Sequence, residues 1–150
     1  MNQTKEQVAQ NAFRIEQEID IEAPLAVTFE ALLEQIGPGF DTVEGKQMPF
    51  KLEPWPGGRW YRDLGNNSGH LWGHVQVIKP PTLLELTGPM MMSYPALSHV
   101  QYRLTERGRG TRLAFIHRVM GDIMPEHREG MPKGWAYILR RIQERAGRAR

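Results

Sequence analysis

The chain has 150 residues, of which 40% are hydrophobic and 24% are charged, and its 19 basic and 17 acidic side chains give a formal net charge of +2. This composition is typical of a globular protein and argues against disorder over the whole chain. The absence of cysteine excludes disulfides, thiol catalysis and thiolate metal sites, and no signal peptide or long apolar run is present, so we expect a cytoplasmic protein without membrane insertion.

The N-terminal part is predicted to be a flexible segment followed by a strand. Residues 1–11 are polar, whereas apolar and charged residues alternate from Phe13 to Ile21. Alternation with period two is typical of a strand with one face in water. Gln17 is a polar residue on the apolar face of this strand. We take residues 1–11 as a flexible segment and residues 12–147 as one domain.

A helix and a series of strands follow. Apolar residues recur at helical spacing from Leu25 to Ile36, after Pro24, which suits a first helical turn, and before Gly37. From residue 48 to residue 106, alternating runs are separated by turn sequences such as WPGG and LGNNSG. Gly73 predicts a bend or bulge in its strand. The loop PMMMSYPAL could act as a gate, a subunit interface or a plug.

The last strand contains His117, the residue that first suggests a site, and a long helix follows it. Leu113, Phe115, His117 and Val119 share one face of the strand RLAFIHRV, so a histidine lies among apolar side chains. After Gly121 the period changes, and an apolar stripe at spacings of three and four predicts a long helix, formed by Met131, Trp135, Ile138, Leu139, Ile142 and Ala146. Pro132 predicts that the continuous helix begins near residue 132.

This order of elements predicts an α+β fold, in which a curved antiparallel sheet of about six or seven strands wraps around the long C-terminal helix. The helix can bury its apolar stripe only against the sheet, and such an arrangement encloses a space.

Five segments, in this order, carry a family resemblance: IDIEAPLAVTFEALLE, WPGGRWYRD, GHVQVIKPPTLLELT, GTRLAFIHRV and KGWAYILRRIQE. They extend from residue 13 to about residue 146 and resemble the START-like superfamily, also called SRPBCC or birch-pollen-allergen-like. Within it, they resemble the branch of the C-terminal domain of the activator of heat-shock protein ATPase. The resemblance implies a helix-grip fold with a cavity between the sheet and the C-terminal helix.

The candidate ligand-binding residues are those expected to face this cavity. We expect His117 and Gln17 to supply its polar groups, with walls from Tyr102, Phe115, Trp60, Trp135, Leu139 and Met91. His117 could instead be a strand-end histidine satisfied by a backbone carbonyl, and Trp135 could be a core anchor. His70 and His74 would lie about 13 Å apart in a strand, too far for one metal ion. We expect no metal, no cofactor and no catalytic residue that the sequence alone can assign.

Three functions remain open at this point. The first is binding of a small hydrophobic or amphipathic ligand in the cavity. The second is a cavity enzyme resembling polyketide cyclases or hydrolases, in which His117 moves protons. The third is a stress-related interaction module that uses the methionine loop or the basic helix face. A homodimer is possible, and we expect no nucleic-acid partner, because the arginines of residues 140–150 suit the end of a helix.

Overall fold

The computed structural model of the protein describes residues 12–149. In these residues, seven strands form one antiparallel sheet in the order β1-β7-β6-β5-β4-β3-β2. The strands are β1 (Ala12–Ile21), β2 (Lys51–Leu52), β3 (Arg59–Gly65), β4 (Ser68–Lys79), β5 (Leu83–Gly88), β6 (Ala96–Arg107) and β7 (Gly110–Gly121). Strands β2 to β7 thus form a meander, and β1 pairs with β7 at one edge of the sheet.

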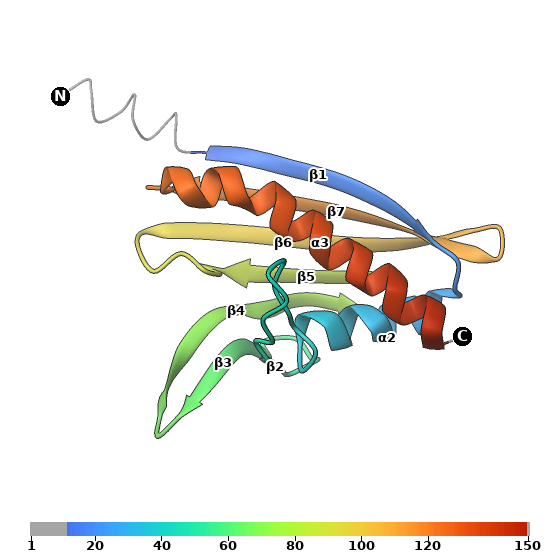
Figure 1. The fold of residues 1–150 in the computed structure, drawn as a ribbon, viewed down its shortest axis with the longest axis horizontal. Coiled ribbons are helices and arrows are strands. Elements are labelled where there is room, and N and C mark those ends of the chain that lie inside the picture. The colour runs from blue at the N-terminus through green and yellow to red at the C-terminus, as the bar shows by residue number, and fades with distance from the viewer. Residues whose placement is uncertain (1–11, 150) are drawn as a thin grey trace.

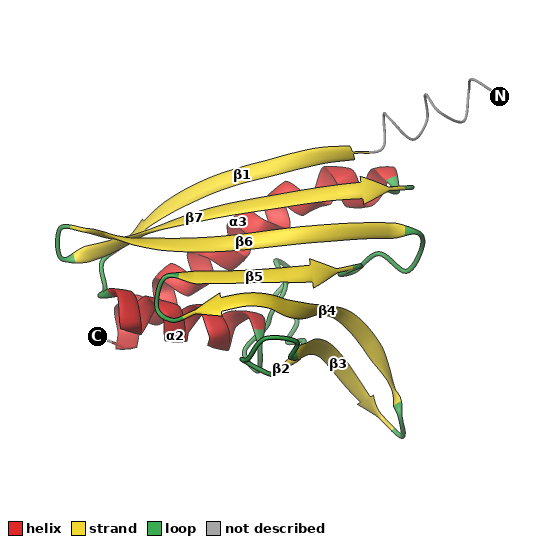
Figure 2. Ribbon diagram, turned by 180° about the vertical axis from the view of Figure 1, so that it is seen from behind, coloured by secondary structure: helices red, strands yellow, loops and turns green. Residues whose placement is uncertain are grey.

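Both helices of the described residues lie on one face of this sheet (Figures 1 and 2). Helix α2 (Leu25–Ile36) follows β1, and helix α3 (Pro125–Ala149) crosses the strands diagonally. Figure 2 shows the other face of the sheet without a covering layer. The predicted α+β helix-grip fold is confirmed. The inner face of the sheet, against α3, is therefore where the core lies.

Strand β7 presents its apolar face to the helices, as the alternation predicts. Leu113, Phe115, His117 and Val119 are all buried, whereas Arg118 and Met120 are exposed. The strand pairs with β6 over its whole length and with β1 from Thr111 to Met120, so a slip of its register by one residue would turn these residues outward. His117 accordingly lies inside the protein.

Helix α3 begins earlier than the sequence predicts. It starts at Pro125 and includes Pro132, so the expected start near residue 132 is wrong. Proline inside a helix removes one backbone hydrogen bond. Met131 and Trp135 are buried on either side of it, and Gln17 Nε2 donates a hydrogen bond of 2.9 Å to the Pro132 carbonyl. These contacts hold both halves of the helix against the sheet.

The bulge expected at Gly73 is confirmed, and it turns a tryptophan inward. Trp60 pairs with Gly73 and Tyr61 pairs with Leu71, so Trp72 is the extra residue of β4. A Cβ atom at Gly73 would lie 2.7 Å from the Thr87 carbonyl oxygen, which explains the glycine at this position. The bulge shifts the alternation of β4, and the Trp72 side chain is buried on the helix side of the sheet.

Within residues 12–149, no helix combines the length and the apolar character needed to cross a membrane. The expected cytoplasmic location stays a prediction.

Candidate functional site

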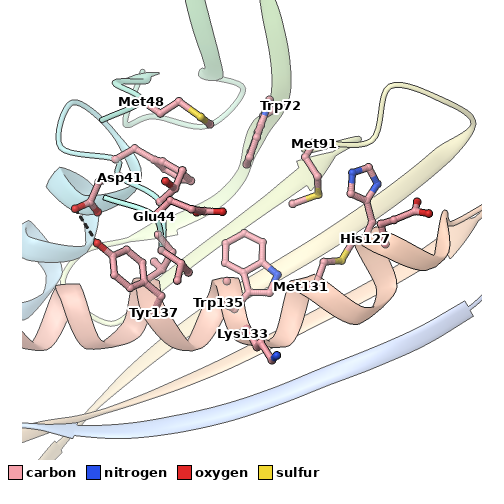
Figure 3. Close-up of a pocket in the computed structure, with 17 residues that line it drawn as sticks. Asp41, Glu44, Met48, Trp72, Met91, His127, Met131, Lys133, Trp135 and Tyr137 are labelled. Carbon is pink, nitrogen blue, oxygen red and sulfur yellow. Dashed lines mark hydrogen bonds between the residues drawn. The ribbon is translucent and has the colours of Figure 1, made fainter. Parts of the chain in front are cut away.

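A cavity of about 460 Å³ lies between the N-terminal half of α3, residues 40–48 (the 40–48 loop), β4 and the loop after β5 (Figure 3). The walls are mainly apolar and aromatic, with Phe40, Met48, Trp72, Met91, Met131, Trp135 and Ile138 among them. Volumes of about 300–1,000 Å³ with such walls are usual for small-molecule sites. The cavity is therefore the candidate functional site.

Two glycines of α3 help to keep this cavity open. Gly130 and Gly134 are one helical turn apart, and both line the cavity. A Cβ atom at either position would meet no atom of another segment within 4 Å. Glycine in a helix interior costs about 1 kcal/mol relative to alanine. The helix thus contains two destabilising residues where a larger side chain would occupy the cavity.

Asp41 fixes the 40–48 loop to both helices. Its carboxylate accepts hydrogen bonds from Gln35 Nε2 at 2.8 Å, from the Tyr137 hydroxyl at 3.0 Å and from Arg141 Nε at 3.1 Å. Burial by itself would raise the pKa of Asp41, but these donors and the charge of Arg141 hold it below its ordinary value. Asp41 is therefore a charged anchor of the cavity wall, with its oxygens already occupied.

His117 is part of a buried hydrogen-bond chain. Trp135 Nε1 lies 2.8 Å from His117 Nδ1, and His117 Nε2 lies 2.7 Å from Ser98 Oγ. An indole N–H can only donate, so Nδ1 accepts and the ring carries its proton on Nε2, which donates to Ser98. Both ring nitrogens of this histidine are thus occupied.

This arrangement keeps His117 neutral. Burial, with a smaller contribution from the charge of His99, lowers the pKa of His117 from 6.5 to about 4. The Nε2–H tautomer cannot take a proton from Ser98, so the pair lacks the geometry of a serine nucleophile with its base. The chain instead fixes the orientation of the Trp135 ring, which forms a wall of the cavity.

A cluster of aromatic rings supports Trp72 from behind. The Trp72 ring centroid lies 4.6 Å from that of Phe50, 5.3 Å from that of Trp60 and 5.7 Å from that of Phe40, all near edge-to-face. Trp60 is fully buried, and its Nε1 donates a 2.7 Å hydrogen bond to the Ile36 carbonyl at the end of α2. Trp72 therefore has little freedom to leave the cavity wall.

The eight residues predicted to contact ligand fall into two groups. Met91 and Trp135 line the cavity. His117, Phe115, Tyr102, Leu139 and Trp60 are buried in the core and do not line it, and Gln17 is a half-buried residue of β1 bonded to Pro132. The structure therefore brings most of these residues together as a packed layer rather than as the cavity surface.

Two buried polar atoms in this group have no hydrogen-bond partner within residues 12–149: the Tyr102 hydroxyl and Gln17 Oε1. Burial raises the pKa of Tyr102, so its hydroxyl keeps its proton. The Tyr102 ring packs at 5.0 Å on Phe115, whose own ring is 5.1 Å from Trp135. Tyr102 thus belongs to the aromatic stack that supports the Trp135 wall.

The methionine loop contributes one side chain to the cavity. Met90 and Met92 are buried in the core, whereas Met91 lines the cavity. The loop is fixed to α3 by Tyr94, whose hydroxyl lies 2.6 Å from His127 Nδ1 and accepts a 3.1 Å hydrogen bond from the Met124 amide. Tyr94 and two of the methionines thus fix this loop, and Met91 is the methionine that lines the cavity.

Sequence reasoning missed Trp72, the 40–48 loop and the two glycines of α3. A glycine that interrupts an amphipathic helix is a signal that could have identified Gly134. Trp72 gave no such signal, because simple alternation along β4 places it with His70 and His74 rather than with Val75. Within the part of the chain that the structure describes, no group of three or more His, Asp or Glu side chains could hold a metal ion.

The chain matches one known protein family. Residues 22–147 match the family described as activator of Hsp90 ATPase homolog 1-like protein. The chain belongs to this family. The match begins directly after β1 and covers α2, strands β2 to β7 and α3 up to residue 147, so every residue that lines the cavity lies inside the family region.

Solved structures share the fold at low sequence identity. Protein MLL2253 from Mesorhizobium loti is 19% identical, with a TM-score of 0.68 over 92% of this chain and 99% of that one. Protein NE0264 from Nitrosomonas europaea is 16% identical, with a TM-score of 0.66 over 95% of this chain and 97% of that one. CalU16 from Micromonospora echinospora is 21% identical, with a TM-score of 0.55 over 88% of this chain and 71% of that one. No curated protein matches the chain.

Proposed function

We propose that this protein binds a small hydrophobic or amphipathic molecule in the cavity between the N-terminal half of α3 and the 40–48 loop. The observation that carries the proposal is the pair Gly130 and Gly134. Both remove side chains from a helix that would be more stable with them, at the point where the helix borders about 460 Å³ of space.

The walls suit an apolar ligand in energetic terms. Burying an alkyl chain gains about 0.8 kcal/mol for each CH₂ group, so a ten-carbon chain gains about 8 kcal/mol before the costs of immobilisation. Trp72 and Trp135 are held by their own packing and hydrogen bonds, so little side-chain entropy is lost when a ligand is bound. A gain of about 8 kcal/mol corresponds to a dissociation constant of about 1 μM, so after these costs we expect a value between about 1 μM and about 1 mM.

The other two functions receive less support. A cavity enzyme was suggested by His117, but its Nε2–H tautomer and lowered pKa do not suit a general base near neutral pH. An interaction module through the methionine loop would need exposed methionines, and Met90 and Met92 are buried. Both functions stay hypotheses, and ligand binding is the one we propose.

Filling the cavity from α3 tests the proposal. Gly134→Leu places a side chain in the cavity and removes a poor helix former, so the protein should be at least as stable in urea. Its affinity for 1-decanol, measured by isothermal titration calorimetry, should fall at least tenfold. Gly147→Leu is the matched control, because Gly147 is an exposed glycine of the same helix outside the cavity lining. Unchanged decanol affinity in Gly134→Leu would contradict the proposal.

A further inference from the structure

We propose that the ligand of this cavity carries a cationic head group, an alkylammonium or protonated amine on an apolar body. Glu44 of the 40–48 loop would face the cation, and the indole rings of Trp72 and Trp135 would lie beside it. This inference rests on the proposed function, since it specifies the class of ligand for the same cavity.

The charges around the cavity favour a cation. Its lining includes three carboxylates: that of Asp41, which is paired with Arg141, and those of Glu44 and Glu126. It includes only one ammonium, that of Lys133. This excess of negative charge is opposite to the formal net charge of the chain, which is +2. Figure 3 shows the Lys133 side chain on the far side of α3 from Trp72. An anionic head group would therefore meet more like charge than opposite charge here.

Glu44 is the carboxylate available to a ligand. Asp41 is already bonded to Gln35, Tyr137 and Arg141, whereas Glu44 makes no hydrogen bond or ion pair with any described residue. In Figure 3 the Glu44 side chain points toward the space between Trp72 and Trp135. The anchored aspartate thus holds the loop in place, and the glutamate three residues later presents its charge to the cavity.

The aromatic walls add a second attraction for the same chemistry. Indole faces attract ammonium groups through the ring quadrupole, and Trp is the best of the aromatic residues in this respect. Trp72 is fixed by Phe50 and Trp60, and Trp135 by its bond to His117. A quaternary ammonium needs no hydrogen-bond acceptor, so it suits a site in which most polar atoms are already paired.

Methionine and isoleucine side chains line the rest of the cavity and suit the apolar body of the ligand. Met91 and Met131 are flexible and adapt to different shapes, and Ile138 extends the apolar wall along α3. This division between a charged, aromatic part and an aliphatic part is what an amphiphile with a small cationic head requires.

Three ligands with the same alkyl chain test the inference: decyltrimethylammonium, 1-decanol and decanoate. The two ions are titrated calorimetrically below their critical micelle concentrations, and decanol below its solubility limit. The cation should bind about tenfold more tightly than decanol, and decanoate should bind more weakly than decanol. If all three bind equally well, or decanoate binds best, the inference is wrong and the proposed cavity function stands. If none of them binds, the proposed function fails and the inference fails with it.

Glu44→Gln identifies the source of the preference. It should lower the affinity for decyltrimethylammonium about threefold, and leave that for decanol unchanged, because an exposed carboxylate contributes modestly. Glu106→Gln is the matched control, since it makes the same charge change at an exposed position of β6 away from the cavity. An equal loss of cation affinity in both variants would mean general attraction to the protein surface and would overturn the role of Glu44.

Discussion

The neutral state of His117 predicts a specific loss of stability in acid. Burial lowers its pKa in the folded protein from 6.5 to about 4, and unfolding exposes the ring to water, where it regains the ordinary value. Above pH 6.5 the ring is neutral in both states and contributes no pH dependence. Between pH 6.5 and pH 4 the unfolded chain takes up a proton that the folded protein does not.

The free energy of unfolding should therefore fall as the pH falls through this window. One pKa unit corresponds to about 1.4 kcal/mol, so the difference between 6.5 and about 4 predicts a total loss of about 3 kcal/mol from this residue. Below pH 4 the ring is protonated in both states, and the loss is complete. A proton on Nδ1 would also face the Trp135 N–H, so the bond that orients this cavity wall would be lost.

A glutamine at position 117 separates this effect from the other acid-sensitive groups. The glutamine amide can accept from Trp135 and donate to Ser98 but does not titrate. Urea unfolding of wild type and His117→Gln, followed by fluorescence from pH 8 to pH 4, should show about 3 kcal/mol more loss in wild type. Parallel pH curves for the two proteins would refute the assignment of a neutral, doubly bonded His117.

Two further predictions concern the anchors of the cavity walls. Asp41→Asn removes the ion pair with Arg141, so it should lower the free energy of unfolding, measured in urea, by about 1–2 kcal/mol. It should also speed amide hydrogen exchange in residues 42–46, and unchanged exchange would contradict the anchoring role of Asp41. Met92 is buried in the core, so Met92→Ser should destabilise the protein by about 2–4 kcal/mol. Met91 lines the cavity, so Met91→Ser should change stability little and weaken decanol binding. Equal destabilisation by both variants would show that Met91 is a core residue.

Much of the fold could be predicted because the spacing of apolar residues within each strand or helix shows which of its faces is buried. The alternation of β7 places His117 inside, and the stripe from Met131 to Ala146 predicts the buried face of α3; both are confirmed. The start of α3 could not be predicted in the same way. Pro132 is unfavourable in a helix on local grounds, and only the packing of Met131 and Trp135 on the sheet explains why the helix continues through it.

The site was less predictable because it depends on irregular backbone. Period-two reasoning fails across the bulge at Trp72, which moves that ring to the inner face. The 40–48 loop shows no hydrophobic periodicity. The role of Asp41 depends on Tyr137 and Arg141 of α3, which follow it by about a hundred residues in the sequence. His117 was correctly placed on the inner face, but its hydrogen-bond partners, which decide its chemistry, come from β6 and α3.

The most direct test of the central claim is to locate bound 1-decanol by NMR. Titration into ¹⁵N-labelled protein should shift the indole N–H signal of Trp72 and the amide signals of Gly130 and Gly134, which border the cavity. Signals from the groove between α2 and the end of α3, around Val27 and Arg145, should stay unchanged. Shifts centred on that groove, or no shifts at saturating decanol, would contradict the claim that this cavity is the binding site.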